Sequence, residues 1–537
     1  AGLGQFGTLA GLKDVEPGTK LDVIPAVVGT QSADLAQSGA PHSGLDNHRV
    51  QVEPSVNLRY NVTPSLAAEA TVNPDFSQVE SDAAQIDVNE TFALSFPERR
   101  PFFQEGSDLF DTWIDVVYTR SINAPIAAGK VTGRFGRTSV AVLSAVDQQT
   151  PMLMPFEEQS TIVEAGQSVS TIVRARRTFG ENSFVGATVT DQRQTEIGGA
   201  GSVVSADAKV QVAGNYRVEA QVALSDIHEP TRPTLADDLD GSTFGRNGYT
   251  AALDGERFQG TGAFLSVDRS ARHWSFDLAY EHNSPTFRTP NGFEQRNDVR
   301  RLRMWQGYEF YRESGIVERL EPGVYVETER NFAGVGKQTY GEVQLWARLK
   351  GQTYLWTNVG YGRERFRGVS FERMANWNVN VNSNFSDPVR LGFNVNGGRA
   401  VFRADPPQLG RSLNASVWGT LQPLPRLTVE PEVRYARMRD VDTDTTFFAG
   451  TILRSKTSVQ ITREFSLRLV TQYNHFNGRI DVEPLLSYEL NPFSVFYVGT
   501  THDYDVVGPG GGARPDTRSL VPTGRQVFVK VQYLFRR

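Results

Sequence analysis

Residues 376–385 read NWNVNVNSNF, and this stretch constrains the fold more than any other. Its even positions are all asparagine, whereas its odd positions carry Trp, Val, Val, Ser and Phe. A β-strand separates two such sets, because its successive side chains point to opposite faces. The same alternation recurs at 215–224, 342–350 and 466–474, where the polar set is often charged. The chain is therefore expected to form long strands with one apolar and one polar face.

Turn signals separate these strands at two kinds of spacing. Short reversals rich in Gly, Pro and Asn occur at 212–217, 349–354, 422–427 and 490–494. Longer polar connections occur at 226–246 and 505–525. Short turns at one end and long loops at the other are typical of outer-membrane barrels.

Length and hydropathy indicate how the strands are arranged. A chain of 537 residues would ordinarily suggest several soluble domains, because a single hydrophobic core stops growing well below that length, unless the fold is one closed sheet. No window approaches the roughly 18 uncharged apolar residues of a membrane-spanning helix. We predict an all-β fold, a large single-chain transmembrane antiparallel β-barrel of about 20–26 strands. Its expected location is the bacterial cell outer membrane, with outer-membrane lipid as a partner.

The last residues support this prediction. In residues 526–536, valines and aromatic residues share one face and Lys530, Gln532 and Arg536 share the other. Such an amphipathic strand resembles the C-terminal strand of outer-membrane barrels, although the chain ends on two arginines. The alternative interpretation is the last strand of a soluble sheet.

Composition excludes several function classes. The chain has no cysteine, which excludes disulfides, thiolate catalysis and cysteine metal sites. A formal net charge of −6 provides no basic footprint for nucleic acid. The seven histidines show no ligand spacing, and no phosphate-binding or dinucleotide-binding motif occurs. We expect no cofactor, no firm metal site and no catalytic residue.

One long segment breaks the alternation. Residues 72–115 are acidic, contain three prolines and carry several phenylalanines. A loop of this length is a lid, a plug or a disordered tail, and the phenylalanines argue against disorder. We predict that residues 1–71 form the first strands and loops, that 72–115 form a plug or constriction in the lumen, and that 116–537 complete the barrel with a closing strand at 526–536.

The charged residues of this segment are candidate anchors. In a water-filled lumen, carboxylates are expected to pair with arginines of the strands and to hold the segment inside. Cation binding and acid–base catalysis are the alternatives. The turn PERRPFF would deliver two arginines to carboxylates of the lumen, while two phenylalanines wedge against the wall. The candidates are Asp75, Glu80, Asp82, Glu90, Glu98, Arg99, Arg100, Phe102, Phe103 and Glu105.

The same segment carries a resemblance. NPDFSQVESD at 73–82, ETF at 90–92 and FPERRPFFQEG at 96–106 are similar to the signature of a bacterial outer-membrane barrel family of unknown function. The resemblance extends to GLKDVEPGTKLDVIPAVVG at 11–29, to 127–145 and to the terminal VKVQYLFRR. In that family a family-9-like carbohydrate-binding module normally precedes the barrel, and that module is absent from this sequence. The resemblance implies a barrel in the outer membrane, and glycan as a partner only if an upstream module exists.

Two further motifs were weighed. Asp238 and Asp240 form an Asp-x-Asp-Gly core without the spacing of an EF-hand, so a solvated loop is favoured over a calcium site. Met152, Leu153, Met154 and Phe156 form an apolar stretch in a connection. This stretch would either contact a partner or fold over the barrel mouth.

These observations predict a gated channel or transport conduit for a solute or a polypeptide, without catalysis by the barrel. The first alternative is a membrane-anchoring scaffold subunit of a larger envelope complex, with envelope proteins as partners. The second is an outer-membrane barrel enzyme, which would need a nucleophile and a base grouped at the lumen or rim.

Overall fold

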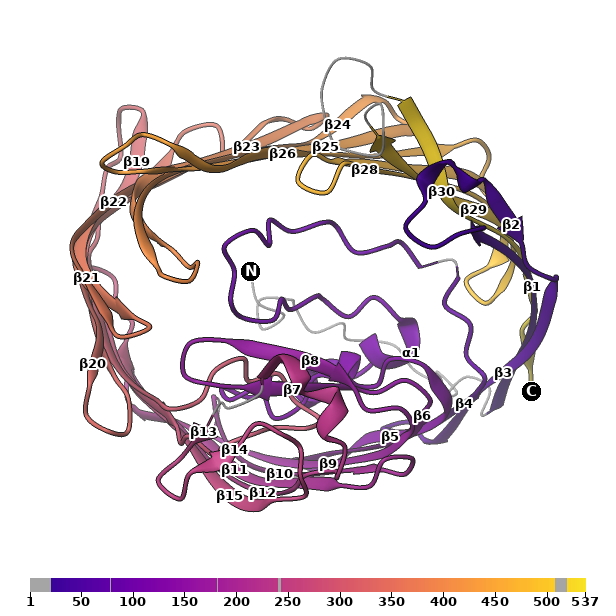
Figure 1. Cartoon of the computed structure of the whole chain (residues 1–537), viewed down its shortest axis with the longest axis horizontal. Coiled ribbons are helices and arrows are strands. Elements are labelled where there is room, and N and C mark those ends of the chain that lie inside the picture. The colour runs from indigo at the N-terminus through magenta and orange to yellow at the C-terminus, as the bar shows by residue number, and fades with distance from the viewer. Residues whose placement is uncertain (1–20, 78, 181, 240–242, 508–518) are drawn as a thin grey trace.

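The structure is a computed structural model that describes residues 21–77, 79–180, 182–239, 243–507 and 519–537. Its main element is a closed antiparallel sheet in which 24 long strands follow one another around a barrel (Figure 1). The ring closes where β1 (Leu21–Leu35) pairs with β30 (Ser519–Gln532) on one side and with β3 (Gln51–Thr63) on the other. The predicted fold class and strand number are confirmed.

The strands pair in chain order, as the short turns predicted. After β3 come β4 (Leu66–Val72), β5 (Pro125–Phe135), β6 (Thr138–Asp147), β9 (Ser168–Phe179), β10 (Ser183–Gln194), β11 (Ala200–Ala213), β12 (Tyr216–His228), β15 (Arg257–Arg269), β16 (Trp274–Asn283), β17 (Val299–Tyr308) and β19 (Val317–Arg330). Next come β20 (Gly336–Leu349), β21 (Thr353–Phe366), β22 (Val369–Ser386), β23 (Val389–Phe402), β24 (Gln408–Leu424), β25 (Leu427–Asp440), β26 (Thr446–Gln460), β27 (Phe465–Asn474), β28 (Arg479–Asn491) and β29 (Ser494–Val507).

Short elements complete the fold. Three short strands extend the barrel sheet, β2 (Leu45–Asn47), β18 (Phe310–Tyr311) and β31 (Phe535–Arg536). Two hairpins are separate from the barrel sheet. The first pairs β7 (Pro151–Pro155) with β8 (Ser160–Glu164), and the second pairs β13 (Thr243–Phe244) with β14 (Tyr249–Thr250). The helices are η2 (Pro41–Ser43), α1 (Pro101–Gln104), η3 (Ser107–Leu109), η4 (Thr119–Ser121), η5 (Pro233–Leu235) and η6 (Asp237–Leu239). No helix among the described residues is long and apolar enough to cross a membrane.

The two faces of each strand differ as the alternation predicted. On β30, Val527, Val529 and Val531 are 37%, 41% and 53% exposed, whereas Phe528 and Lys530 between them are 5% and 3% exposed. Exposed valines and leucines recur on the outer face around the barrel. Because lipid offers the backbone no hydrogen bonds, a closed sheet with an apolar exterior is the β-structure that can span a bilayer.

Two predicted strand boundaries need correction. The strand expected from residue 116 begins at Pro125, because Val116 is fully buried against the wall and makes no ladder. The closing strand, expected at 526–536, already begins at Ser519 and breaks after Gln532. We call residues 73–124, between β4 and β5, the inner segment.

Candidate functional site in the barrel interior

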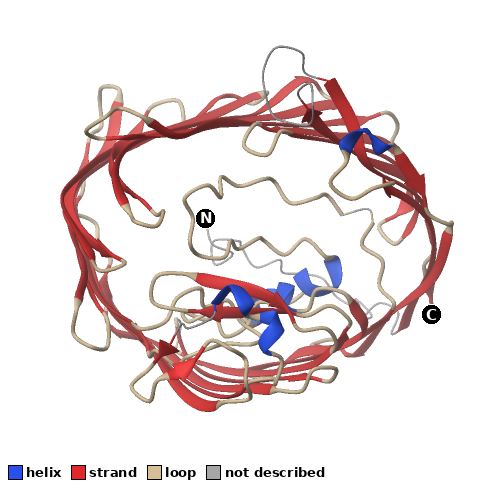
Figure 2. Ribbon diagram, viewed as in Figure 1, coloured by secondary structure: helices blue, strands red, loops and turns tan. Residues whose placement is uncertain are grey.

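The inner segment lies inside the ring of strands (Figures 1 and 2). Its long loop contacts strands that are far apart around the barrel. Near its start Asp75 meets Lys530 of β30, and in its middle the Asn89 side-chain amide donates to the carbonyl of Val401 on β23 at 3.0 Å. Near its end the backbone N–H of Ile114 donates to Gln221 of β12 at 2.8 Å. The segment therefore has anchor points on three parts of the wall.

Glu80 is the most heavily paired carboxylate of the inner segment. It contacts Arg454 at 2.5 Å and Lys456 at 3.3 Å, both on β26, and Arg99 of its own segment at 3.2 Å. Burial alone would raise the pKa of Glu80, but the hydrogen bond from Arg454 and the nearby cations more than offset it and lower that pKa. Glu80 therefore stays charged and bound to the wall at neutral pH.

The turn PERRPFF is held by Arg100, which is 9% exposed. Its guanidinium donates to the carbonyls of Ile122 at 2.6 Å and Thr119 at 3.0 Å, and to the Glu98 carboxylate at 2.7 Å. It also lies 4.3 Å from the centre of the Phe103 ring. Burial would raise the pKa of Glu98, but the hydrogen bonds from Arg100 and Thr119 lower it. Arg100 therefore joins the turn to the last residues of the inner segment.

The turn arginines pair differently from the prediction. Arg99 contacts Glu80 and Asp82, and Arg100 contacts Glu98, so both bind carboxylates of the segment itself rather than of the strands. The reason is local, because the segment doubles back and brings its acidic first half beside the turn. The strands supply cations instead, as Lys530 and Arg454 show.

The remaining candidates lie in the same region. Phe103 is 2% exposed and packs with Phe110, Ile122 and the wall residues Leu143 and Ile172. Phe102 packs at the edge of this cluster, and its carbonyl accepts from Lys130 of β5 at 2.6 Å. Glu105 pairs with Arg59 of β3 at 2.7 Å, Asp82 pairs with Arg120, and Glu90 accepts a bond from the Phe92 N–H at 3.4 Å.

The apolar stretch at 151–156 forms the β7–β8 hairpin inside the ring (Figure 1). Met154 is fully buried in a cluster with Ala236, Leu239, Ala251 and Leu253 of the connection between β12 and β15, and Met152 and Phe156 pack against that cluster. Leu153 pairs with Ile162 across the hairpin. The backbone N–H of Ser160 donates to Thr91 of the inner segment at 2.9 Å. The hairpin thus packs over the inner segment within this one chain.

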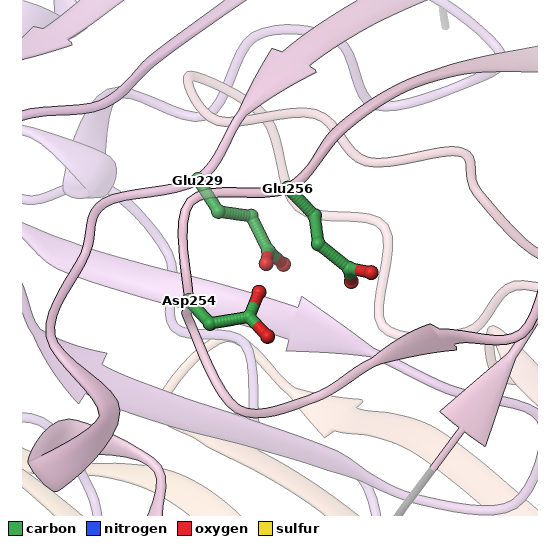
Figure 3. Close-up of side chains that lie close together, drawn as sticks. All are labelled: Glu229, Asp254 and Glu256. Atoms are coloured by element: carbon green, nitrogen blue, oxygen red, sulfur yellow. The ribbon is translucent and has the colours of Figure 1, made fainter.

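Three carboxylates that the sequence did not single out meet at the base of the same connection. Ligand oxygens of Glu229, Asp254 and Glu256 lie within 4.8 Å of one another (Figure 3). Glu229 is 2% exposed and pairs with the buried Arg288 at 2.6 Å. That guanidinium compensates the charge of the buried Glu229, whereas Asp254 is exposed to water and Glu256 is partly exposed. The calcium candidate at Asp238 and Asp240 cannot be placed, since Asp240 lies outside the described residues and the Asp238 side chain is not described.

Asp115 and Glu294 form a carboxyl pair that joins the inner segment to the connection between β16 and β17. The N–H of Asp115 donates to Glu294 at 2.8 Å, and the N–H of Phe293 donates back to the Asp115 carbonyl at 2.9 Å. Burial raises the pKa of Asp115 to about 6, and Asp111 adds to the rise. Burial raises the pKa of Glu294 to about 7, with Asp115 adding to it. These carboxyls titrate near neutral pH.

The chain was compared with known proteins. A family model described as "Domain of unknown function (DUF5916)" matches residues 19–134, which include the first strands and the inner segment. A search of curated proteins gave no match.

Several solved structures resemble the fold. A ferric enterobactin receptor (PfeA) of Pseudomonas aeruginosa in complex with enterobactin is 10% identical, covers 97% of this chain and 82% of its own, and has a TM-score of 0.46. The FrpB iron transporter of Neisseria meningitidis is 10% identical, covers 76% of this chain and 79% of its own, with a TM-score of 0.47. The copper transporter OprC is 10% identical, covers 97% and 81%, with a TM-score of 0.49.

Proposed function

We propose that this protein is an outer-membrane conduit whose lumen is partly closed by the inner segment, and that the barrel itself performs no catalysis. The observation that carries the proposal is the set of ion pairs between the inner segment and separate parts of the wall, above all Asp75 with Lys530 and Glu80 with Arg454. Both pairs are largely shielded from water, so they hold the first half of the inner segment to the wall where it lacks the apolar packing of the second half.

The arrangement divides the interior into two kinds of contact. Around Phe103 and Ile122 the inner segment packs firmly on β6 and β9, with fully buried apolar side chains. Between Asp75 and Asn89 it contacts the wall through polar side chains and few apolar ones. Gating would therefore involve release of the first half while the second half stays docked.

The scaffold alternative loses its sequence feature. It rested on the apolar stretch at 151–159 as a partner surface, and Met154 of that stretch is fully buried within the chain.

The resemblance pairs the NPDF to EG signature with a family-9-like carbohydrate-binding module, and glycan stays a proposed partner of such a module rather than of the inner segment.

Single-channel conductance in planar bilayers tests the proposal. The intact chain is compared with a variant in which a short Gly-Ser linker replaces residues 76–105. A second variant, with the same linker in place of the exposed turn 441–445, is the matched control. We expect low conductance from the intact chain and the control, and a large steady pore from the first variant. Equal conductance of all three, in barrels whose folding is verified by heat-modifiable migration, would overturn the proposal.

A further inference from the structure

One part of the inner wall is chemically distinct from the rest. On β20–β24 the inward positions carry asparagine and tryptophan, and we call this surface the amide–aromatic wall. Register places Asn378 opposite Asn358 and Asn396, and Trp346 opposite Trp356. Directly opposed residues in an antiparallel ladder share one face. Its residues are Trp346, Trp356, Asn358, Asn376, Asn378, Asn380, Asn382, Asn394, Asn396, Asn414 and Trp418.

The part of this wall on β21–β24 carries no charge over four stretches of inward positions. The inward positions within 356–362, 376–382, 392–400 and 412–418 are all Asn, Ser, Gly, Ala or Trp. The adjoining strands β25 and β26 turn Glu432, Arg434 and Arg454 inward instead, and the last two contact the inner segment. A charged solute would find no counter-ion at these positions of β21–β24, so this part of the wall favours uncharged polar solutes. At the β20 border the inward Glu342 accepts a hydrogen bond from Asn358.

The amides form a partly satisfied network. Asn382 donates to Asn380 at 2.7 Å, Asn396 to Asn394 at 2.9 Å, and Asn414 to Asn396 at 3.0 Å. Within the described part of the chain, the Trp356 indole nitrogen and the Oδ1 atoms of Asn358 and Asn378 are buried without a hydrogen-bond partner. An unmade hydrogen bond at a buried polar atom costs about 1–3 kcal/mol. A hydroxyl group, which both donates and accepts, suits the partly exposed amides of Asn380, Asn394 and Asn414 in the same network.

The tryptophans add flat apolar surfaces beside the amides. Trp346 is 45% exposed on the inner side, and its ring stacks with Trp356 at 5.4 Å between centroids. A cavity of about 550 Å³ adjoins Trp346, and its lining combines Trp305, Tyr325, Gln344 and Trp346 with the charged residues Asp277, Arg303 and Glu321. Exposed aromatic rings inside a watery lumen are unfavourable unless they contact a ligand.

We propose that the amide–aromatic wall binds uncharged saccharides. A sugar ring presents hydroxyl groups at its edge, which suit the amides, and C–H groups on its face, which suit the indoles. Neighbouring strands lie about 4.8 Å apart, so the wall across β20–β24 is about 20 Å wide and has room for several sugar units in a row. The inference deepens the proposed function by naming the class of solute. Passage of the saccharide through the barrel depends on the proposed conduit, whereas its binding to the wall does not.

Titration with maltohexaose tests this inference by two readouts, intrinsic tryptophan fluorescence of the purified full-length barrel and blockade of ion current through the variant with the linker in place of residues 76–105. Trp346→Ala removes an indole from the wall. The matched control is Trp377→Ala, because Trp377 is 41% exposed on the outer face of β22. Asn378→Asp, which keeps the side-chain shape and adds a charge, is the second variant in case Trp346→Ala does not fold.

We expect maltohexaose to change the fluorescence, with binding weakened about tenfold or more by Trp346→Ala or Asn378→Asp and unchanged by Trp377→Ala. No fluorescence response, an equal response in all variants, or tighter binding of a neutral Gly-Ser hexapeptide would overturn the inference. A conducting barrel that maltohexaose neither binds nor blocks would refute the saccharide class alone. If the variant with the linker in place of residues 76–105 stays silent while the intact chain binds maltohexaose through Trp346, the conduit alone is refuted.

Discussion

Lys530, on the last long strand, donates to both the carboxylate of Asp75 at 2.9 Å and its backbone carbonyl at 3.0 Å. The two residues are 455 positions apart in the chain. Lys530 is 3% exposed, so this ammonium group is separated from bulk water. The contact therefore ties the start of the inner segment to the strand that closes the barrel.

Replacing Lys530 by Met should release the first half of the inner segment. The substitution keeps most of the side-chain volume but leaves the Asp75 carboxylate without this partner, which is costly at a shielded site. We expect more frequent or larger single-channel openings and faster proteolysis between residues 75 and 90. Lys350→Met, at an exposed turn, is the control. Unchanged conductance and cleavage would show that Lys530 does not hold the segment.

Arg100 and Arg99 are neighbours with different expected sensitivities. Arg100 uses its planar fork to reach Ile122, Thr119 and Glu98, and a lysine cannot reproduce that geometry. Arg100→Lys should therefore loosen the turn and raise proteolysis of the inner segment severalfold. Arg99→Lys should have a small effect, since Arg99 is more exposed and makes longer contacts. Equal effects of the two substitutions would contradict the proposed role of Arg100.

The strands could be predicted from the sequence because their signal is local. In 376–385 the asparagines and the apolar residues occupy opposite faces, and Trp377 is outward and 41% exposed as its position requires. The inner segment could be recognised as a break in that alternation. Its partners could not, because the contacts of Glu80 with Arg454 and of Asp75 with Lys530 join distant positions.

The failures of prediction share one cause, which is that contacts between distant parts of the chain leave no local pattern in the sequence. Val116 and Val117 begin a β-like stretch, yet Val116 packs against Phe264 and Phe287 of the wall without forming a ladder. Glu229 and Glu256 meet because they flank a long connection, and nothing in their spacing indicates it. The amide–aromatic wall could have been partly foreseen from the asparagine run, but its tryptophans come from other strands.

Arg174 and Asp207 form the most deeply buried ion pair of the described wall, each with a side chain 1% exposed. Arg174 also donates to Thr188 at 2.9 Å and to the Leu109 carbonyl of the inner segment at 3.2 Å. Asp207→Ala would leave this guanidinium buried and uncompensated, and we expect a loss of about 3–5 kcal/mol in the free energy of unfolding. Denaturant titration of the barrel in detergent measures it.

The control for that measurement is Asp191→Ala, because Asp191 pairs with Arg193, whose side chain is 71% exposed. Exposed pairs contribute about 0–1 kcal/mol, so this variant should unfold close to the wild-type midpoint. A loss below about 1 kcal/mol for Asp207→Ala would show that water or another group compensates Arg174.

The contact between Asp115 and Glu294 should depend on pH. Their folded-state pKa values, about 6 and about 7, are raised above the ordinary carboxyl values. A raised carboxyl pKa means that the docked state binds protons more tightly, so docking is strongest below about pH 4.5 and weakens as the pH rises through 6 to 7. The negative charge of Asp111 further raises the pKa of Asp115, and that of Glu281 further raises the pKa of Glu294. Neither pKa is lowered by a nearby cation.

Hydrogen exchange of the amides at 115–118 checks this prediction, with rates corrected for the intrinsic pH dependence of exchange. Protection should fall between pH 5 and pH 8 in the wild type. Glu294→Gln should remove most of that fall, because the amide keeps the acceptor for the Asp115 N–H and carries no charge. Asp108→Asn, at an exposed position of the inner segment, should leave the fall unchanged. Protection that is constant with pH in the wild type, or that rises, would refute the assignment of this pair as the pH-sensitive contact of the inner segment.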